Sequence, residues 1–216
     1  MAKIESSFKN MVLVLPIITI ISALAVTSVY LVTKEPIALA QKEKQERAIR
    51  EVIPEFDALK VQKITLNDTD IIHINKGFKG NELVGYAVET FSTKGYDPTP
   101  IKVMVGFKPC GEIINTSVLQ QKETPGLGTK MAEPKFEDQF NNKDPKTFKL
   151  RVKKDGGGVD GITAATISSR AFCDAVDKAY NAVSKLEEEI KSVYCDTVNK
   201  TQNTNELERN ATNEPS

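Results

Sequence analysis

The chain has few of the residues on which most metal and catalytic sites depend. Its 216 residues include no tryptophan, one histidine and three cysteines. Cys110, Cys173 and Cys195 form no C-x-x-C pair, so together with His73 they predict neither a zinc site nor an iron–sulfur cluster. No acidic residue stands at a spacing from His73 that is diagnostic of a Ser-His-acid triad, and we expect this histidine to be structural. We therefore predict no catalytic residue and no metal ligand.

An excess of charge of one sign is also lacking. Lys+Arg and Asp+Glu both number 29, so the formal net charge is zero. Proteins that bind nucleic acid carry a basic surplus, so no nucleic-acid partner is expected. Three cysteines allow one disulfide outside the cytoplasm and leave one over. Cys173 lies within a helical pattern and is expected to be a small packed residue.

One long segment, from Met11 to Val32, contains no charged side chain. It is long enough for a transmembrane helix, which needs about 20 apolar residues. Pro16 lies inside the segment, and membrane helices tolerate proline better than soluble helices do. We therefore expect a single N-terminal membrane anchor.

The charges before this segment predict its orientation. Lys3 and Lys9 are accompanied by a single acid, Glu5, which favours a cytoplasmic N-terminus and a main domain that is periplasmic or extracytoplasmic. A cleaved signal peptide is the alternative, because Ala23-Leu24-Ala25 has the A-x-A form of a cleavage site. The apolar residues continue past that site to Val32, which favours an uncleaved anchor in the cell inner membrane.

The rest of the chain predicts an α+β fold with a mostly antiparallel sheet and flanking helices. A helix over Lys34–Ile53 and an amphipathic helix from Ser168 to about Tyr194 are expected, the second with a buried stripe. The expected strands are Lys60–Ile64, Asp70–Ile74 followed by a turn at Asn75–Gly77, Leu83–Glu89, Ile101–Phe107, Glu112–Val118 and Phe148–Val152. A short helix over Glu133–Phe140 and a flexible hinge at Gly156–Gly158 complete the pattern.

The expected division of the chain has five parts. They are a cytoplasmic N-terminus (1–10), a transmembrane helix (11–32), a helical stalk (33–56), a folded domain (57–195) and a polar tail (196–216). The tail is rich in Asn, Thr and Glu and is expected to be disordered, because it has too little apolar surface to bury.

One loop of the folded domain carries two glycines and a proline within six residues, Glu123-Thr124-Pro125-Gly126-Leu127-Gly128. The glycines permit backbone conformations closed to other residues and let a ligand approach closely. Leu127, between them, is placed to lie against a flat ring. Turn chemistry alone allows the alternative of a tight surface turn.

A second motif, Asp160-Gly161-Ile162-Thr163-Ala164-Ala165-Thr166, directly precedes the long amphipathic helix. The start of a helix favours a bound phosphate, because unpaired N–H groups and the positive end of the helix dipole point outward there. The alternative is an ordinary helix start with Asp160 or Thr163 as the N-cap residue.

In this order, and after a single apolar segment, the two motifs resemble the FMN-binding domain family found in the G component of the Rnf complex and in the C component of the sodium-translocating NADH:quinone reductase. The resemblance covers about Met11 to Ser184, and the Glu123–Gly128 match is complete. The compact length and the run Ala165–Ala171 are more similar to the Rnf protein. In one position the sequence departs from the family, because the usual glycine of Ser/Thr-Gly-Ala-Thr is Ala164. Alanine matters there if the backbone needs a positive φ.

The resemblance implies that residues 57–195 form an FMN-binding domain with FMN attached covalently to the Thr166 hydroxyl through a phosphoester. It implies that a flavin transferase moves FMN from FAD onto that oxygen, using a divalent metal, and recognises Asp160 and Gly161. The further contacts to the cofactor that it implies are from Thr163, Ala165, Glu123, Thr124, Pro125, Gly126, Leu127 and Gly128.

By the same resemblance, the chain is expected to be an electron-carrying subunit of an ion-translocating ferredoxin:NAD oxidoreductase, the Rnf complex. Its partners would be the membrane and iron–sulfur subunits of that complex, and it would not be catalytic alone. The C component of a sodium-translocating NADH:quinone reductase is one alternative. An anchored binding or scaffold module without a cofactor is an alternative of another class.

Overall fold

The computed structural model describes residues 8–66 and 71–186 of the chain. The first element, α1 (Phe8–Val52), is a single helix of 45 residues that includes Pro16 and Pro36. It contains both the expected transmembrane helix and the expected stalk helix. By length and composition it is able to cross a membrane. The chain divides into two units between Glu46 and Arg47, so the last turns of α1 belong to the folded unit.

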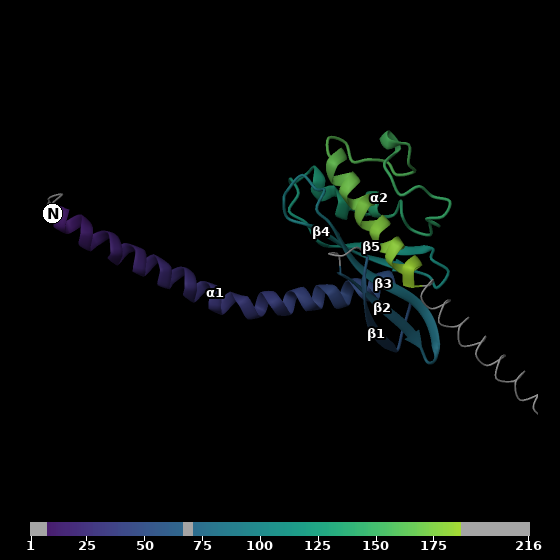
Figure 1. The fold of residues 1–216 in the computed structure, drawn as a ribbon, viewed down its shortest axis with the longest axis horizontal. Helices are drawn as coiled ribbons and strands as arrows, with labels where there is room; N and C mark the ends of the chain where they lie inside the picture. The colour runs from purple at the N-terminus through teal and green to yellow at the C-terminus, as the bar shows by residue number, and fades with distance from the viewer. Residues whose placement is uncertain (1–7, 67–70, 187–216) are drawn as a thin grey trace, which may run out of the picture. The chain divides into compact units, whose positions relative to one another are not determined.

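The folded unit contains a five-stranded antiparallel sheet in the order β1-β2-β3-β4-β5. Figure 1 labels its strands. Each strand follows its neighbour in the sequence, which short turns allow and which confirms the expected fold class. The strands are β1 (Ala58–Thr65), β2 (Ile71–Lys79), β3 (Glu82–Ser92), β4 (Ile101–Phe107) and β5 (Ile113–Gln120).

The prediction of a turn at Asn75–Gly77 is wrong, because β2 continues through these residues. Gly77 pairs with Gly85 of β3, and a Cβ on either glycine would lie 3.3 Å from the side chain of Ile53. The two glycines therefore make room for a packed residue inside the sheet. The chain instead turns at Gly80, whose φ of +61° suits glycine.

The prediction of a strand over Phe148–Val152 is also wrong, since only Val152 makes a β-bridge, to Val159. The segment between them folds into a hydrogen-bonded turn with the short 3-10 helix η2 (Lys153–Asp155). A Cβ on Gly157 would lie 1.9 Å from the Arg151 carbonyl oxygen. The glycines therefore close a tight turn, and the flexible hinge expected at Gly156–Gly158 stays a prediction.

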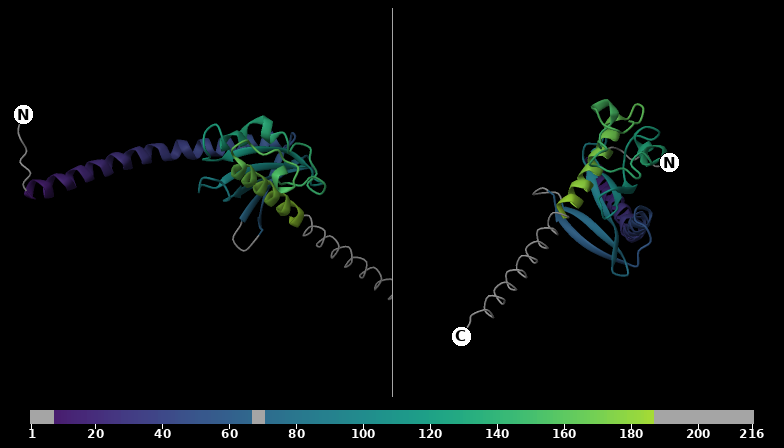
Figure 2. Two further views of the ribbon diagram at one scale, coloured as in Figure 1. Left: turned by 90° about the horizontal axis from the view of Figure 1, so that it is seen from above. Right: turned by 90° about the vertical axis from the view of Figure 1, so that its right-hand side faces the viewer.

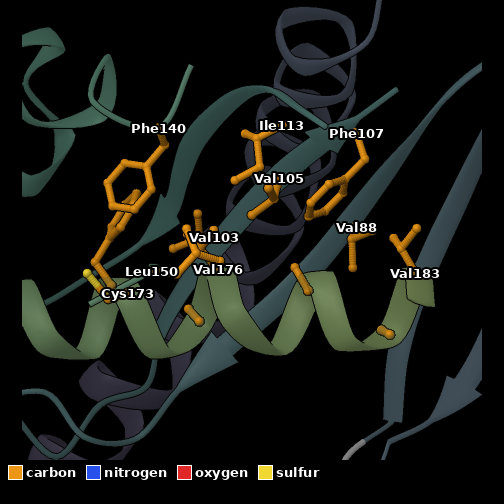
Figure 3. Close-up of a cluster of buried hydrophobic side chains, with 14 of the residues drawn as sticks. Val88, Val103, Val105, Phe107, Ile113, Phe140, Leu150, Cys173, Val176 and Val183 are labelled. Atoms are coloured by element: carbon orange, nitrogen blue, oxygen red, sulfur yellow. The ribbon is translucent and has the colours of Figure 1, made fainter. Parts of the chain in front are cut away.

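Two layers cover the sheet. One face packs against the C-terminal helix, which begins at residue 166 and is described to residue 186. This helix runs across the strands (Figures 1 and 2). Figure 3 shows Val103, Val105 and Phe107 of β4 pointing toward this helix. The opposite face packs against the last turns of α1, where Val52 and Met104 are both buried. Gly106 admits this helix, because a Cβ there would lie 1.8 Å from the Val52 carbonyl oxygen.

The expected buried stripe of the C-terminal helix is confirmed. Phe172, Val176, Val183 and Leu186 are buried, and the ring of the half-buried Tyr180 lies 6.4 Å from that of Phe107. Fully burying a side chain such as Phe172, Val176, Val183 or Leu186 contributes about 1.5–3 kcal/mol, so the stripe fixes the helix on the sheet.

The helix starts at residue 166 rather than at Ser168. The expected helix over Glu133–Phe140 is shorter in the structure, a single turn labelled α2 (Pro134–Glu137). It follows the 3-10 helix η1 (Gly128–Ala132). The expectations for the cytoplasmic start of the chain, the polar tail and Cys195 fall wholly or largely outside the described residues.

Candidate functional site

Both motifs contribute to one pocket of about 590 Å³. The pocket lies where the loop after β5 meets the start of the C-terminal helix. A third segment, the loop between β3 and β4, completes it. The lining residues are Tyr96, Glu123, Thr124, Leu127, Gly128, Ala164, Ala165, Thr166, Ile167 and Ser168.

The Glu123–Gly128 loop is a preorganised turn. The Leu127 N–H donates to the Thr124 carbonyl oxygen at 3.1 Å, with Pro125 second in the turn and Gly126 third at a φ of +75°. This is the residue pattern of a type II turn. The Thr129 hydroxyl accepts the Gly126 N–H at 3.0 Å, and this hydrogen bond helps to fix the turn. The turn leaves the Leu127 side chain 39% exposed at the pocket.

Gly128 brings this loop against the C-terminal helix. A Cβ at this position would lie 2.6 Å from both the Glu123 Cβ and the Ser168 hydroxyl oxygen. Real Cβ atoms do not approach other atoms so closely, so any larger residue would push the loop and the helix apart. The glycine is required for close approach, whereas Gly126 is required for its positive φ.

A buried carboxylate joins the three segments around the pocket. Glu123 is only 4% exposed. Its Oε2 accepts the Ser168 hydroxyl at 2.7 Å, and its Oε1 accepts the Tyr96 N–H at 2.9 Å. A buried carboxylate is stable only when such donors replace water. Its hydrogen bonds therefore hold the loop after β5, the β3–β4 loop and the helix start together.

The second motif forms a tight turn followed by the helix start. The Ala165 N–H donates to the Ile162 carbonyl oxygen at 3.0 Å, and the Ser169 N–H donates to the Ala165 carbonyl oxygen at 3.0 Å. Ala165 is therefore the N-cap residue and Thr166 is the first residue of the helix. Neither Asp160 nor Thr163 caps the helix, so the N-cap roles considered for them are wrong.

Ala164 lies third in this turn and has a φ of +60°. A type II turn requires a positive φ at that place, which glycine supplies without strain. The condition under which alanine matters is therefore met. A left-handed backbone costs a residue other than glycine about 1–2 kcal/mol. The Ser169 hydroxyl, which accepts the Ile162 N–H at 2.9 Å, helps to hold the strained turn in place.

Thr166 is half-buried and lines the pocket. The first N–H groups of a helix have no acceptor within it, and they carry the positive end of the helix dipole. A phosphate beside the Thr166 hydroxyl would therefore find donors and a favourable field. Thr166, Ala165, Glu123, Thr124, Leu127 and Gly128 are the expected site residues that the structure brings together here.

The other expected site residues lie elsewhere. Asp160, Gly161 and Thr163 line a second pocket of about 400 Å³ with Lys130 and Gln139. The Gln139 side chain accepts the Asp160 N–H at 2.7 Å and donates to its carbonyl oxygen at 3.2 Å, so it holds this part of the motif at both ends. The Asp160 carboxylate pairs with Lys153 at 2.7 Å. Pro125 and Gly126 line neither pocket.

Sequence reasoning missed Tyr96, Ile167 and Ser168. Tyr96 is 72% exposed and Ile167 is 47% exposed, and with Leu127 they give the pocket an apolar rim. Their signal in the sequence is weak. Gly95-Tyr96-Asp97-Pro98 has turn composition, but its place beside the two motifs follows only from the tertiary fold.

Two ionisable side chains near the C-terminal helix have shifted pKa values, and local contacts explain both shifts. Two hydrogen bonds of 2.6 Å from Arg170 lower the pKa of Asp155 and tie the η2 turn to the helix. Burial raises the pKa of the Cys173 thiol to about 12, so this packed thiol stays protonated.

His73 lies in β2, beside a third pocket that also includes Glu89 and Lys102. Within residues 8–66 and 71–186, no three His, Cys, Asp or Glu side chains are grouped to hold a metal ion.

Comparison with known proteins gives consistent matches. Residues 95–181 match the FMN-binding domain family, and this segment contains every residue that lines the pocket of Thr166. The chain is 30% identical over 190 residues to the G component of the ion-translocating oxidoreductase complex of Pasteurella multocida, which covers 82% of this chain and 92% of that protein. It is 32% identical over 173 residues to the G component of the proton-translocating ferredoxin:NAD(+) oxidoreductase complex of Clostridium ljungdahlii, covering 79% and 88%.

A comparison with solved structures gives one further match to report. It is the C component of the Na(+)-translocating NADH-quinone reductase of Parabacteroides distasonis, which is 18% identical to this chain. The match has a TM-score of 0.43 and covers 66% of this chain and 80% of the other.

Proposed function

Because the chain belongs to the family of G components of ion-translocating oxidoreductase complexes, we propose that it is the membrane-anchored subunit that carries FMN on Thr166 within such a complex. One observation carries the proposal: Thr166, the first residue of a helix, lines the same pocket as the Glu123–Gly128 loop. The hydroxyl that would accept FMN therefore lies beside the residues that would hold its ring.

The pocket suits the two ends of FMN. Its volume of about 590 Å³ is in the range of cofactor sites, roughly 300–1,000 Å³. The N–H groups at the start of the helix suit the phosphate. The rim formed by Tyr96, Leu127 and Ile167 suits the flat isoalloxazine, because it exposes apolar surface that water solvates poorly.

The attachment needs only one group of this chain to react. The Thr166 oxygen would attack the FMN phosphorus of FAD, which forms the phosphoester, releases AMP and gives up the hydroxyl proton. A flavin transferase with its divalent metal would supply the catalysis, and it would recognise Asp160 and Gly161, which are exposed. Thr166 is then a fixed attachment point that does not turn over.

A covalent bond suits a cofactor held outside the cytoplasm. A flavin that dissociates there would be lost, whereas a tethered one does not incur the association entropy again. When bound, FMN supplies the redox chemistry, and the protein positions it and sets its electrostatic surroundings. Electrons would pass from reduced ferredoxin toward NAD through the iron–sulfur and membrane subunits, with this protein as one relay.

The proposed anchor places residues 57–195 on the outer side of the inner membrane, with the N-terminus in the cytoplasm. Cys110 offers a direct test of this orientation, because it is exposed whereas Cys173 is buried. In intact cells with Cys195→Ser, a membrane-impermeant maleimide should label Cys110 and not Cys173. Labelling only after the inner membrane is broken would refute the orientation.

The function itself is tested in membranes of a host that assembles the complex. We expect Thr166→Val to assemble with its iron–sulfur partners but to lose flavin and ferredoxin:NAD electron transfer, whereas Thr163→Val retains both. Full electron transfer with Thr166→Val would refute the proposal. A wild-type protein that assembles and remains colourless would favour the scaffold alternative.

A further inference from the structure

We propose that Tyr96 forms a wall of the flavin pocket and contacts the isoalloxazine, and that Glu123 is the positioning residue that holds this wall against the turn bearing Thr166. The inference rests on the proposed function and adds to it a ring contact and a role for the buried carboxylate. Both roles follow from the position of the Glu123 carboxylate between the β3–β4 loop and the helix start. A single buried carboxylate accepts hydrogen bonds from Tyr96 and from Ser168, which is two residues beyond Thr166.

The two oxygens of Glu123 are both engaged in protein contacts. Oε1 accepts the N–H of Tyr96 at 2.9 Å and lies 3.4 Å from the N of Asp97, which also donates to it. Oε2 accepts the Ser168 hydroxyl at 2.7 Å. Because this carboxylate is 4% exposed and both of its oxygens accept hydrogen bonds from the protein, its role in the site is to fix the distances between the loops.

Two glycines show how tightly this carboxylate is enclosed. A Cβ on Gly95, the residue before Tyr96, would lie 2.6 Å from Glu123 Oε1. On the other side, a Cβ on Gly128 would lie 2.9 Å from Oε2. The β3–β4 loop is therefore packed directly against Glu123, and the hydrogen bonds from Tyr96 and Asp97 to Oε1 hold it there. The position of Tyr96 is set by the same contacts that set the position of the helix start.

The side chain of Tyr96, in contrast to that of Glu123, is not buried by the protein. It is 72% exposed, although it lines the pocket, and its loop is anchored at the backbone. An anchored loop that presents an uncovered aromatic ring beside a pocket is suited to a flat aromatic ligand, because offset stacking contributes about 0.5–1.5 kcal/mol beyond the area buried. Leu127 lies on the rim of the same pocket and would supply an apolar contact from the other loop.

Stacking of a phenol on a flavin has a spectroscopic signature. The excited isoalloxazine takes an electron from a phenol in contact with it and returns the electron without emitting light, so its fluorescence is quenched. Phenylalanine has the same shape but is a far poorer donor. Comparing Tyr96→Phe with Tyr96→Ala therefore separates quenching by the phenol from a general effect of packing.

The experiment uses the full chain, co-expressed with a flavin transferase and purified in detergent. Flavin occupancy at Thr166 is measured by peptide mass, and flavin fluorescence is measured before and after denaturation. We expect the native fluorescence yield of Tyr96→Ala and Tyr96→Phe to rise several-fold over wild type at equal occupancy. The matched control is Thr93→Ala, an exposed residue of the same loop that does not line the pocket, and it should keep the wild-type yield.

Glu123 is tested in the same way. Glu123→Gln keeps an oxygen for the Tyr96 N–H and an amide that can donate to Ser168, so it should keep the quenching. Glu123→Ala should lose it, and Ser168→Ala provides a second, milder break if Glu123→Ala does not fold. Unchanged fluorescence in both Tyr96 variants at full occupancy would overturn the ring contact and leave the proposed function intact. Wild-type protein without FMN on Thr166 would overturn both.

Discussion

The strained backbone at Ala164 makes a quantitative prediction. Ala164→Gly changes an exposed residue, so no buried methyl group is lost, and it acts on a residue with a φ of +60°. Relief of the left-handed strain stabilises the folded state by about 1–2 kcal/mol. The greater freedom of glycine in the unfolded chain offsets about 0.4–1 kcal/mol of this. The net expectation is a stabilisation of about 1 kcal/mol.

For a folded unit of this size, 1 kcal/mol corresponds to a rise in Tm of about 3 °C. The assay is thermal unfolding of the full chain in detergent, followed by near-ultraviolet circular dichroism of tyrosine and phenylalanine, since the chain has no tryptophan. The matched control is Ala132→Gly, at an exposed alanine in η1 whose φ is not positive. That variant should lose about 0.5–1 kcal/mol. A fall in Tm for Ala164→Gly as large as that of the control would refute the reasoning.

Two further predictions concern stability. Gly128→Ala should destabilise the fold by about 1–3 kcal/mol, because its Cβ would lie 2.6 Å from atoms of Glu123 and Ser168. In a urea titration, a loss no larger than that of Gly161→Ala, whose Cβ would have no neighbour closer than 3.9 Å, would contradict the packing account. Burial raises the folded-state pKa of Glu137 to about 7 from 4.5, so the folded state binds the extra proton between these values, and stability should fall as pH rises from 4.5 to 7 and level off above it. Because the group is partly exposed, we expect a change of about 1–2 kcal/mol, which Glu137→Gln should abolish in unfolding curves recorded across this pH range.

Local patterns in the sequence predict much of this fold, because they record which face of an element is buried. The alternation in Ile101–Phe107 and the helical spacing from Phe172 to Leu186 both identify the core. The same local patterns misplace the turn at Asn75–Gly77. A glycine in a strand that makes room for Ile53 looks, in the sequence alone, like a glycine that turns the chain.

The candidate site is less accessible to such reasoning. The two motifs are visible as glycine-rich and threonine-containing loops, but the contacts that join them span the sequence. Glu123 reaches Tyr96 across 27 residues and Ser168 across 45. No local pattern encodes these distances, and Tyr96 is accordingly missed. The positive φ of Ala164 is likewise set by the turn and the helix start together, against the preference of alanine itself.

The central claim is that the hydroxyl of Thr166 carries FMN beside the Glu123–Gly128 loop. Tandem mass spectrometry of proteolytic peptides from the flavinylated full chain tests it most directly. The account predicts a mass increase of FMN less one water on the peptide with Thr166, with fragment ions that exclude Thr163, and no such increase in Thr166→Val. A modified Thr163 in the wild type, or an unmodified peptide from a host that contains the transferase, would contradict it.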